Sequence, residues 1–484
     1  MKTISFITTI FFSSLIFGQN ADDALRYAQT NLIGTARFSS MGGAFGALGG
    51  DFSAIGINPA GLAIYRKSEF CISPSVFNIK SVATYNNSNR EDFKLNFNLG
   101  NTGIVLANLM QPFGEPKGWI SKNFSIGYNQ INNFNNHITT EGENSKTSLL
   151  NVYLDQALNY GNPKSPANLD PFGNQLAYNT YLIDDTIGKG NYFSQIPAST
   201  PLTQRKTISN QGSMGESFLA FAGNYNNKLF LGGSIGLNFI TYKQLSNYEE
   251  IIKTKNPNIK LDSYQLLEEL KTTGYGINLK MGLIYKYTDW LRLAVAIHTP
   301  TYYKMSDSWN NSIQANFNSG FDTTSKSPIG NYDYSLYTPA KAIGSLSFVF
   351  NKYAILSTDY EIIDYSSARL SAKSENYFDQ NANIQNNLKP TGNLKIGAEW
   401  KLNPFSIRSG FNYLGNPYKN SSINGIRKNY SFGVGIREEN YFLDFGYVLS
   451  EFSSIHYLYD KNLVNPVNIE NKSHNFLMTI GINF

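Results

Sequence analysis

Short segments in which apolar and polar side chains alternate recur along most of this 484-residue chain and constrain its fold more than any other feature. In residues 274–287, GYGINLKMGLIYKY, every second residue from Tyr275 to Tyr287 is apolar or aromatic, and Asn278 and Lys280 belong to the set between them. A period of two places these sets on opposite faces of a β-strand. The same alternation occurs in residues 291–298, 394–402 and 441–449.

Two folds fit strands that have one apolar and one polar face. In a soluble sandwich the apolar face packs inward, whereas in a membrane barrel it faces lipid and the polar face lines the lumen. Tyr275 and Tyr287 stand at the two ends of the apolar band, and aromatic residues prefer the two interfaces of a bilayer. The alternation therefore favours the membrane barrel.

The start of the chain indicates export from the cytoplasm. One lysine precedes an apolar run from Ile4 to Phe17, and Gly18 follows. The run is shorter than the roughly 20 residues of a membrane-spanning helix, so residues 1–18 are expected to be a signal peptide. Cys71 is the only cysteine, which excludes an internal disulfide. The net charge of +5 includes no basic run, so we expect no nucleic-acid partner.

The connections between strands give an independent test. About fourteen strands are expected, at 69–85, 93–109, 122–137, 213–225, 229–245, 271–287, 290–305, 335–350, 353–366, 390–402, 405–415, 429–437, 441–455 and 473–484. Short turns follow every even strand from the fourth to the twelfth, and long polar connections follow most odd strands, notably 138–212, 246–270, 306–334 and 367–389. Outer-membrane barrels combine short periplasmic turns with long external loops. The sequence thus predicts an all-β fold, a transmembrane antiparallel β-barrel spanning residues 69–484.

The end of the chain agrees with this fold. In HNFLMTIGINF, Phe476 and the final Phe484 belong to the apolar face of a last strand. A terminal aromatic residue on such a strand resembles the signal that the barrel-insertion machinery reads, so this machinery is an expected partner through Phe484. We expect the protein in the outer membrane of a Gram-negative cell, in contact with membrane lipid.

The segment before the first expected strand is not part of the barrel wall. A barrel of this size has a lumen that its own side chains do not fill. Residues 19–68 lack alternation, and residues 42–61 are rich in Gly and Ala, which let backbone approach a wall closely. We therefore expect residues 19–68 to form a hatch inside the barrel, with a short helix opened by Asn20 or Asp22.

The stretch ARFSSMGGAFGALGGDFSAIGINPAGLA resembles the N-terminal hatch of the FadL/TodX family of outer-membrane transporters for hydrophobic compounds. The resemblance assigns Asp51, Asn58, Pro59, Ala60 and Gly61 to the hatch and its gating. It implies a fourteen-stranded barrel with a hatch, and passive uptake of long-chain fatty acids or aromatic hydrocarbons. Extracellular loops would capture the ligand, and movement of the hatch would release it, in this family often sideways through the wall.

A helical stripe in the 138–212 connection is the candidate site of ligand capture. In SLLNVYLDQALNYG the stripe comprises Leu150, Tyr153, Leu154, Ala157 and Leu158. A helix that only packs on the rim of the barrel explains the same stripe equally well.

Other readings of the sequence remain open. Some barrels related to this family bind a protein partner in secretion without transport, and others are called haemin receptors, which would give His298 an iron to bind. GGSIG at 232–236 matches a hydrolase motif but lies within an alternating strand, so we expect no enzyme. We also expect no cofactor and no metal. Asp359, Glu361, Arg292, Arg408 and Lys280 are expected to face the lumen and to pair with opposite charges.

Overall fold

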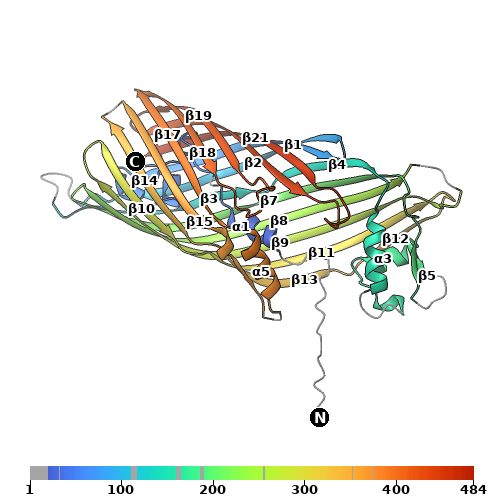
Figure 1. Cartoon of the computed structure of the whole chain (residues 1–484). Helices are drawn as coiled ribbons and strands as arrows, with labels where there is room; N and C mark the ends of the chain where they lie inside the picture. The colour runs from blue at the N-terminus through green and yellow to red at the C-terminus, as the bar shows by residue number, and fades with distance from the viewer. Residues whose placement is uncertain are drawn as a thin grey trace, which may run out of the picture.

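The strands form a closed antiparallel β-barrel, seen from the side in Figure 1. The first strand, β1 (Glu69–Tyr85), pairs with β2 (Ser88–Leu106) on one side and with the last strand, β21 (Val467–Asn483), on the other, which closes the barrel. The computed structural model describes residues 20–31, 33–110, 117–159, 165–185, 190–253, 257–351, 353–373 and 375–484. The expected signal peptide lies outside these ranges.

The wall consists of fourteen passes within the described residues, which confirms the predicted fold class. Four passes consist of more than one strand: β3 with β4, β10 with β11, β12 and β13 with β14, and β15 with β16. The further strands are β3 (Trp119–Asn133), β4 (Asn136–Asn144), β7 (Leu202–Tyr225), β8 (Leu229–Ile252), β9 (Leu261–Lys286), β10 (Leu291–His298), β11 (Tyr302–Phe317), β12 (Asp322–Lys326), β13 (Gly330–Tyr337), β14 (Lys341–Phe350), β15 (Ala354–Asp364), β16 (Arg369–Ser371), β17 (Pro390–Leu402), β18 (Phe405–Leu414), β19 (Arg427–Arg437) and β20 (Tyr441–His456).

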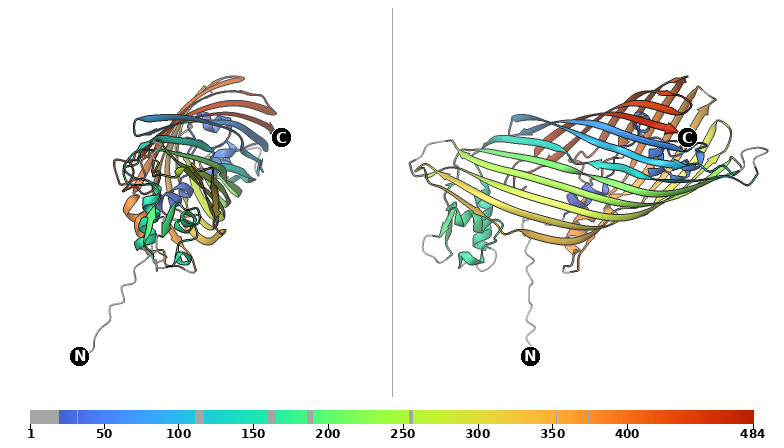
Figure 2. Two further views of the ribbon diagram at one scale, coloured as in Figure 1. Left: turned by 90° about the vertical axis from the view of Figure 1, so that its right-hand side faces the viewer. Right: turned by 180° about the vertical axis from the view of Figure 1, so that it is seen from behind.

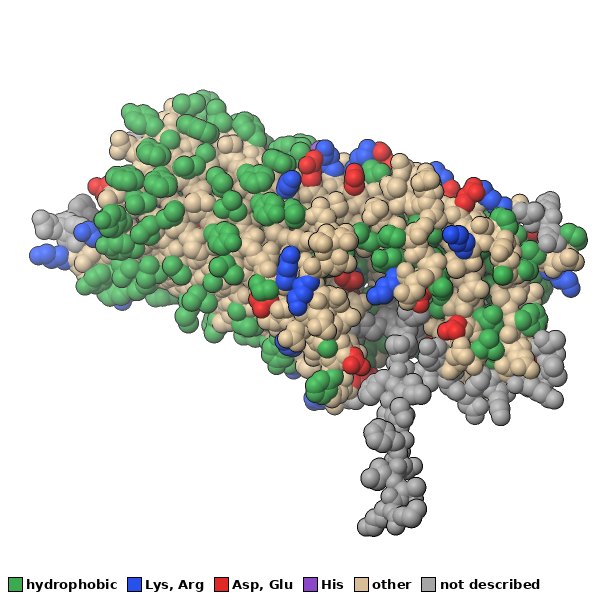
Figure 3. Space-filling view, in the orientation of Figure 1, with side chains coloured by type: hydrophobic (Ala, Val, Ile, Leu, Met, Phe, Trp, Pro, Cys, Tyr) green, Lys and Arg blue, Asp and Glu red, His purple; other side chains and the backbone are tan. Residues whose placement is uncertain are grey.

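The apolar residues of the alternating strands face outward and the polar residues face the lumen, as the sequence predicts. On β9 the apolar set from Tyr275 to Tyr285 points outward, with Met281 65% exposed, whereas Asn278 and Lys280 are each 8% exposed and face the lumen. Apolar side chains of this kind cover the half of the barrel on the left of Figure 3. Charged and polar side chains dominate the other half, so one end of the barrel carries the lipid-facing belt.

Several strands continue well beyond the predicted boundaries. The connection expected at 246–270 is mostly strand, because β8 runs to Ile252 and β9 begins at Leu261. The 138–212 connection likewise begins with β4 and ends within β7. In these extensions the outward positions are polar, as at Asn247 and Glu249, so the hydrophobic period ends although the backbone pairing continues.

The helices are short and lie within the barrel or at its polar half. They are α1 (Ala21–Ala28), α2 (Ala36–Ser40), α3 (Leu149–Asn159), α4 (Asn174–Asn179), α5 (Phe378–Asn387) and the 3-10 turns η1 (Phe52–Gly56), η2 (Pro59–Ile64), η3 (Pro166–Asn168) and η4 (Tyr365–Ser367). None of those in the described ranges has the length and apolar character to cross a membrane. As predicted, Asn20 opens α1; its side chain accepts hydrogen bonds from the backbone N–H groups of Asp22 and Asp23.

Candidate functional site

The N-terminal segment, residues 20–68, lies within the barrel, where Figure 2 shows it in blue behind the strands. Its apolar side chains pack against the inner faces of wall strands. Phe52 packs on Phe218 of β7 with ring centres 5.4 Å apart. Tyr27 of α1 packs edge to face on Tyr242 of β8, at 6.4 Å. The segment therefore fills lumen space that the wall side chains leave open.

The motif Asn58-Pro59-Ala60-Gly61 contacts the wall at its turn. The Asn58 side chain, 1% exposed, donates to the Gly46 carbonyl at 2.8 Å and accepts from the Ala60 N–H at 3.0 Å. It also approaches the carbonyl of Leu283 on β9, at 3.4 Å. Pro59 begins η2, where a missing N–H costs no hydrogen bond. Asn58 thus ties two parts of the segment to one wall strand; the gating role of this motif stays a prediction.

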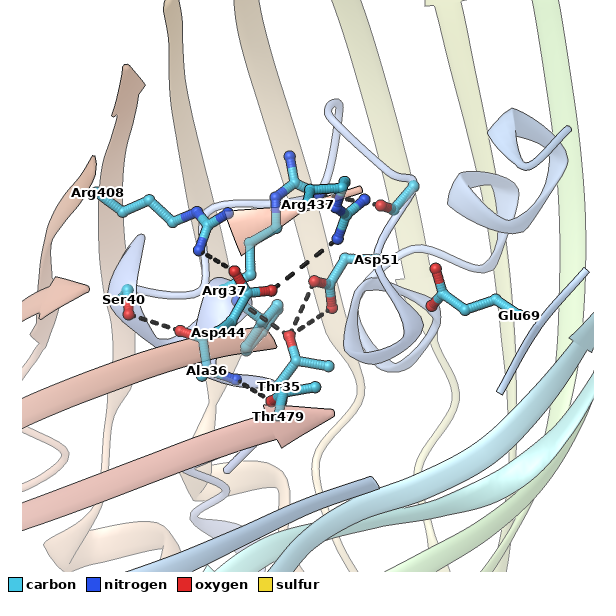
Figure 4. Close-up of polar contacts among 12 residues, drawn as sticks. Thr35, Ala36, Arg37, Ser40, Asp51, Glu69, Arg408, Arg437, Asp444 and Thr479 are labelled. Atoms are coloured by element: carbon cyan, nitrogen blue, oxygen red, sulfur yellow. Dashed lines mark hydrogen bonds and ion pairs between the residues drawn. The ribbon is translucent and has the colours of Figure 1, made fainter. Parts of the chain in front are cut away.

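Asp51 organises the fold of the segment itself. Its carboxylate accepts hydrogen bonds from Thr35 Oγ1 at 2.8 and 2.9 Å and from the Ser53 N–H at 3.0 Å. Asp51 therefore caps η1 and holds it beside the start of α2 (Figure 4). The predicted residue is buried, at 5% exposed, and its contacts lie within the segment. A gating role for Asp51 likewise stays a prediction.

A buried charge layer joins the segment to strands β17–β20. Arg37 of α2 donates to the two carboxylate oxygens of Glu399 at 2.8 and 3.2 Å, and Arg408 donates to Glu399 at 2.7 Å and to Asp444 at 2.5 Å. The last of these contacts is drawn in Figure 4, where Arg437 also approaches Asp444, at 4.0 Å. Arg408, Glu399 and Asp444 are at most 2% exposed. Because breaking a buried ion pair is costly, this layer anchors α2 firmly.

Two other lumen-facing charges, Asp359 and Arg292, contact backbone groups of the segment. Asp359 accepts hydrogen bonds from the Gly46 N–H at 3.0 and 3.2 Å, and Arg292 donates to the Leu48 carbonyl at 2.8 Å. The expected charge pairing is found for Arg408 and for Lys280, which pairs with Glu216. His298 contacts the Ile57 carbonyl through Nε2, at 2.8 Å. That nitrogen is already engaged by the segment, so the geometry lends no support to an iron site at His298.

Two neighbouring cavities lie along the segment. The outer cavity, of about 610 Å³, lies beside α1 and is lined by polar residues and by aromatic side chains including Phe77, Phe134 and Tyr242. The inner cavity, of about 130 Å³, lies between α2 and the wall and contains the Lys280 and Glu216 pair in its lining. Both are lined by Thr30, Asn31, Ile33, Phe77, Leu414 and Ser450. The residues between α1 and α2 therefore separate the two spaces.

The barrel wall has a break in its hydrogen-bond ladder. Within residues 88–106 and 119–144, all of which the structure describes, β2 and β3 are paired only from Asn101–Leu106 to Phe124–Asn129. Beyond that point β2 still pairs with β1, and β3 and β4 still pair with β7. We call the stretch between residues 88–100 and 130–144 the ladder break. Side chains join the strands there, as where Asp92 accepts a hydrogen bond from the Thr139 N–H at 2.6 Å.

The N-terminal segment covers the ladder break from inside. The Ile33 N–H donates to the Gln130 carbonyl at 2.9 Å, and the Asn31 N–H donates to the Ile131 carbonyl at 2.8 Å. The Gln29 carbonyl accepts from the Asn132 side chain at 3.1 Å. Residues 29–31 and 33–34, which we call the strap, thus pair with the edge of β3 that β2 leaves free. The strap therefore covers part of the ladder break from the lumen side.

The predicted capture helix, α3, lies on the polar half of the barrel (Figure 1). Leu150 is fully buried, Tyr153 is 7% exposed, Leu154 is half-buried and Leu158 is 41% exposed. Burial raises the pKa of the Tyr153 phenol. The stripe mainly packs α3 against a core that includes β8 and β9 residues, so only its end at Leu158 is open to a ligand. Capture by these residues stays a prediction.

Sequence reasoning missed Arg37, Glu399 and the strap. Arg37 is a single charge in a small-residue stretch, and its partner lies 362 residues away. The one signal for the partner was Glu399, an acid on the polar face of an alternating strand. Nothing in the alternation of β2 or β3 marks the ladder break. Among described residues, no cluster of three or more His, Cys, Asp or Glu side chains could hold a metal ion.

Comparison with known proteins finds a likeness of fold to several solved structures. No protein-family model and no curated protein sequence matches the chain. Among solved structures, the toluene transporter TodX of P. putida matches over 94% of this chain and 99% of its own, with 12% identity and a TM-score of 0.52. A FadL homologue of Pseudomonas aeruginosa matches over 93% and 98%, with 13% identity and a TM-score of 0.52.

The monoaromatic hydrocarbon channel CymD matches over 94% of this chain and 98% of its own, with 13% identity and a TM-score of 0.50. At these identities the likeness shows a common fold, a fourteen-stranded barrel with a helical segment before its first strand. The resemblance seen in the sequence is thus confirmed at the level of the fold.

Proposed function

We propose that this protein is a FadL/TodX-type channel of the bacterial outer membrane that takes up hydrophobic or amphipathic molecules without an energy source. The observation that carries the proposal is the strap, a short piece of the enclosed N-terminal segment that pairs with the wall at the ladder break. The fold of TodX and CymD, whose names describe hydrocarbon transport, supports the same class of ligand.

The proposed path has three steps. A ligand enters from the polar half of the barrel and occupies the outer cavity, where aromatic side chains offer apolar surface. Its presence beside α1 displaces residues 29–31 and 33–34 from β3. The ligand then leaves through the ladder break into the lipid layer, because the inner cavity is small and has charged residues in its lining.

The proposal is tested by the molecules that the protein carries. The protein would be purified in detergent, and bound small molecules would be identified by mass spectrometry. We expect fatty acids, hydrocarbons or related amphiphiles at about one per chain. An Asn58→Ala/Pro59→Ala variant, in which the contact with β9 is weakened, should carry less ligand than the natural protein.

Two results would contradict this proposal and indicate another function. A ligand-free barrel that co-purifies with one protein partner would indicate a binding barrel in secretion. Haem in the absorption spectrum would indicate a haemin receptor, with His298 as the first residue to replace.

A further inference from the structure

Buried side-chain amides in which at least one atom has no hydrogen-bond partner gather at the ladder break. Six residues in the described part of the chain share this property there: Asn96, Asn98, Asn101, Asn129, Gln130 and Asn136. Buried polar atoms are nearly always paired in native proteins, and each exception calls for an explanation. Other amides with an unpaired atom in the described residues are spread over the rest of the barrel. Six around one feature of the wall point to a common cause.

Asn98 of β2 contacts amides on both sides of the break. Its Oδ1 accepts a hydrogen bond from Asn96 at 2.7 Å and lies 3.5 Å from Gln130 Nε2 and 3.4 Å from Asn133 Nδ2, across the break. Asn101 and Asn129 are partners on the last rung of the ladder. Asn133 and Asn136 also line the outer cavity. The amide cluster therefore extends from the lining of the outer cavity to the ladder break.

The unpaired oxygen and nitrogen atoms indicate which chemical groups of a ligand can form hydrogen bonds here. Oxygen atoms are unpaired in Asn96, Asn101, Gln130 and Asn136, the nitrogen atom in Asn98, and both atoms in Asn129. A hydrocarbon offers these atoms nothing, and a carboxylate offers acceptors only. A hydroxyl group donates one hydrogen bond and accepts two, so it satisfies an amide in either orientation of its side chain. Several neighbouring hydroxyls match this cluster best.

We propose that the ladder break is a binding site for the neutral, hydroxyl-rich head group of an amphiphile. This inference rests on the proposed function and narrows its ligand class. The head group occupies the amide cluster while the apolar tail lies against Phe77, Phe134 and Tyr242 in the outer cavity. On the lipid side, β2 presents Phe93, Leu95 and Phe97, which are 59%, 59% and 80% exposed and receive the tail on release.

The test compares three probes that share a ten-carbon chain and differ in their head group: decyl glucoside, decanoate and decane. The full-length protein is placed in lipid nanodiscs, and each probe is titrated against a bound fluorescent reporter. We expect decyl glucoside to bind at least about tenfold more tightly than decane or decanoate, because two well-formed hydrogen bonds account for about one power of ten.

Variants locate the site. An Asn98→Leu/Asn129→Leu variant should weaken decyl glucoside binding about tenfold and leave decane binding within about twofold. Asn98→Ala serves as a second variant that adds no bulk at the centre of the cluster. Asn238→Leu is the matched control, because both amide atoms of Asn238 are also buried and unpaired, but Asn238 lies on β8 and lines the inner cavity. Decyl glucoside binding should be unchanged in that control.

The outcomes separate this inference from the proposed function. Binding of all three probes with equal affinity, tightest binding of decanoate, or equal losses in the Asn98 variants and the Asn238 control would overturn the inference and leave the channel standing. If no probe binds the natural protein, the proposed function fails as well.

Discussion

Gly282 lies on the inner face of β9, directly against the Asn58 side chain. A Cβ atom at position 282 would overlap with Asn58 Oδ1, so the wall approaches the segment as closely as it does only because this residue is glycine. We predict that Gly282→Ala lowers the free energy of unfolding by about 1–3 kcal/mol, as overpacking of a tight contact does. Denaturant unfolding of the protein in lipid vesicles measures this change.

Gly344 provides the control for that prediction. It lies on β14, and a Cβ atom there would meet nothing within 4 Å. Gly344→Ala should change the free energy of unfolding by less than about 0.5 kcal/mol. Equal effects of the two substitutions would show that the segment does not press against β9 at Asn58.

Individual charges show how far sequence reasoning reaches at the scale of the residue. The alternation of β18 and β20 places Arg408 and Asp444 on the lumen face, and both are indeed buried there. Their partners could not be predicted, because they depend on which strands are neighbours and where α2 enters the lumen. Arg292 and Asp359 were expected to pair with other charges and instead contact backbone groups of the segment.

At the scale of the element, α3 is attached to the barrel by packing and by one buried acid. Glu250 of β8 accepts hydrogen bonds from Ser148 Oγ at 2.5 Å and from the Leu149 N–H at 3.0 Å, at the start of the helix. Leu150 is fully buried beside them. Leu150→Ala should therefore destabilise the docked helix by about 2–5 kcal/mol and make residues 145–201 sensitive to protease.

Leu158 gives the comparison for α3, because it is 41% exposed at the other end of the stripe. Leu158→Ala should leave protease resistance unchanged. Lower ligand affinity in Leu158→Ala would support the predicted capture role. If Leu150→Ala leaves the helix as resistant as before, the packing described for α3 is wrong.

The strands show which elements the sequence reveals and which it does not. Where a strand crosses lipid, one face must be apolar, so the alternation locates it to within a few residues. Beyond the lipid the outward face is mostly polar, although inner residues such as Tyr248 and Leu266 stay buried against the α3 core. The extensions of β7, β8 and β9 were therefore expected to be loops. The ladder break was not foreseen either, because it depends on the register between β2 and β3 rather than on the composition of either strand.

At the scale of the whole molecule, two groups of contacts join the N-terminal segment to the wall of the barrel. The charge layer and the Asn58 turn hold residues 35–64 against the wall. The strap is joined to β3 by two backbone hydrogen bonds and one side chain, and to β14 by the Thr30 hydroxyl, which accepts a hydrogen bond from Lys341. Because few contacts must be broken there, the strap is the part of the segment that can open at the least cost. We therefore propose that the strap, residues 29–31 and 33–34, is the gate and that residues 35–64 are its fixed support.

A reversible cross-link between strap and wall tests this central claim. Ile33 and Gln130 face each other across an antiparallel bridge, where paired Cα atoms lie about 4.5–5.5 Å apart, within reach of a disulfide. The only natural cysteine, Cys71, is buried. In Ile33→Cys/Gln130→Cys, the account predicts that oxidation stops uptake of the ligand into vesicles and that reduction restores it. A Thr207→Cys/Asn247→Cys pair, on the permanent ladder of β7 and β8, should transport in both states. Uptake by the oxidised strap variant at the natural rate would contradict the account.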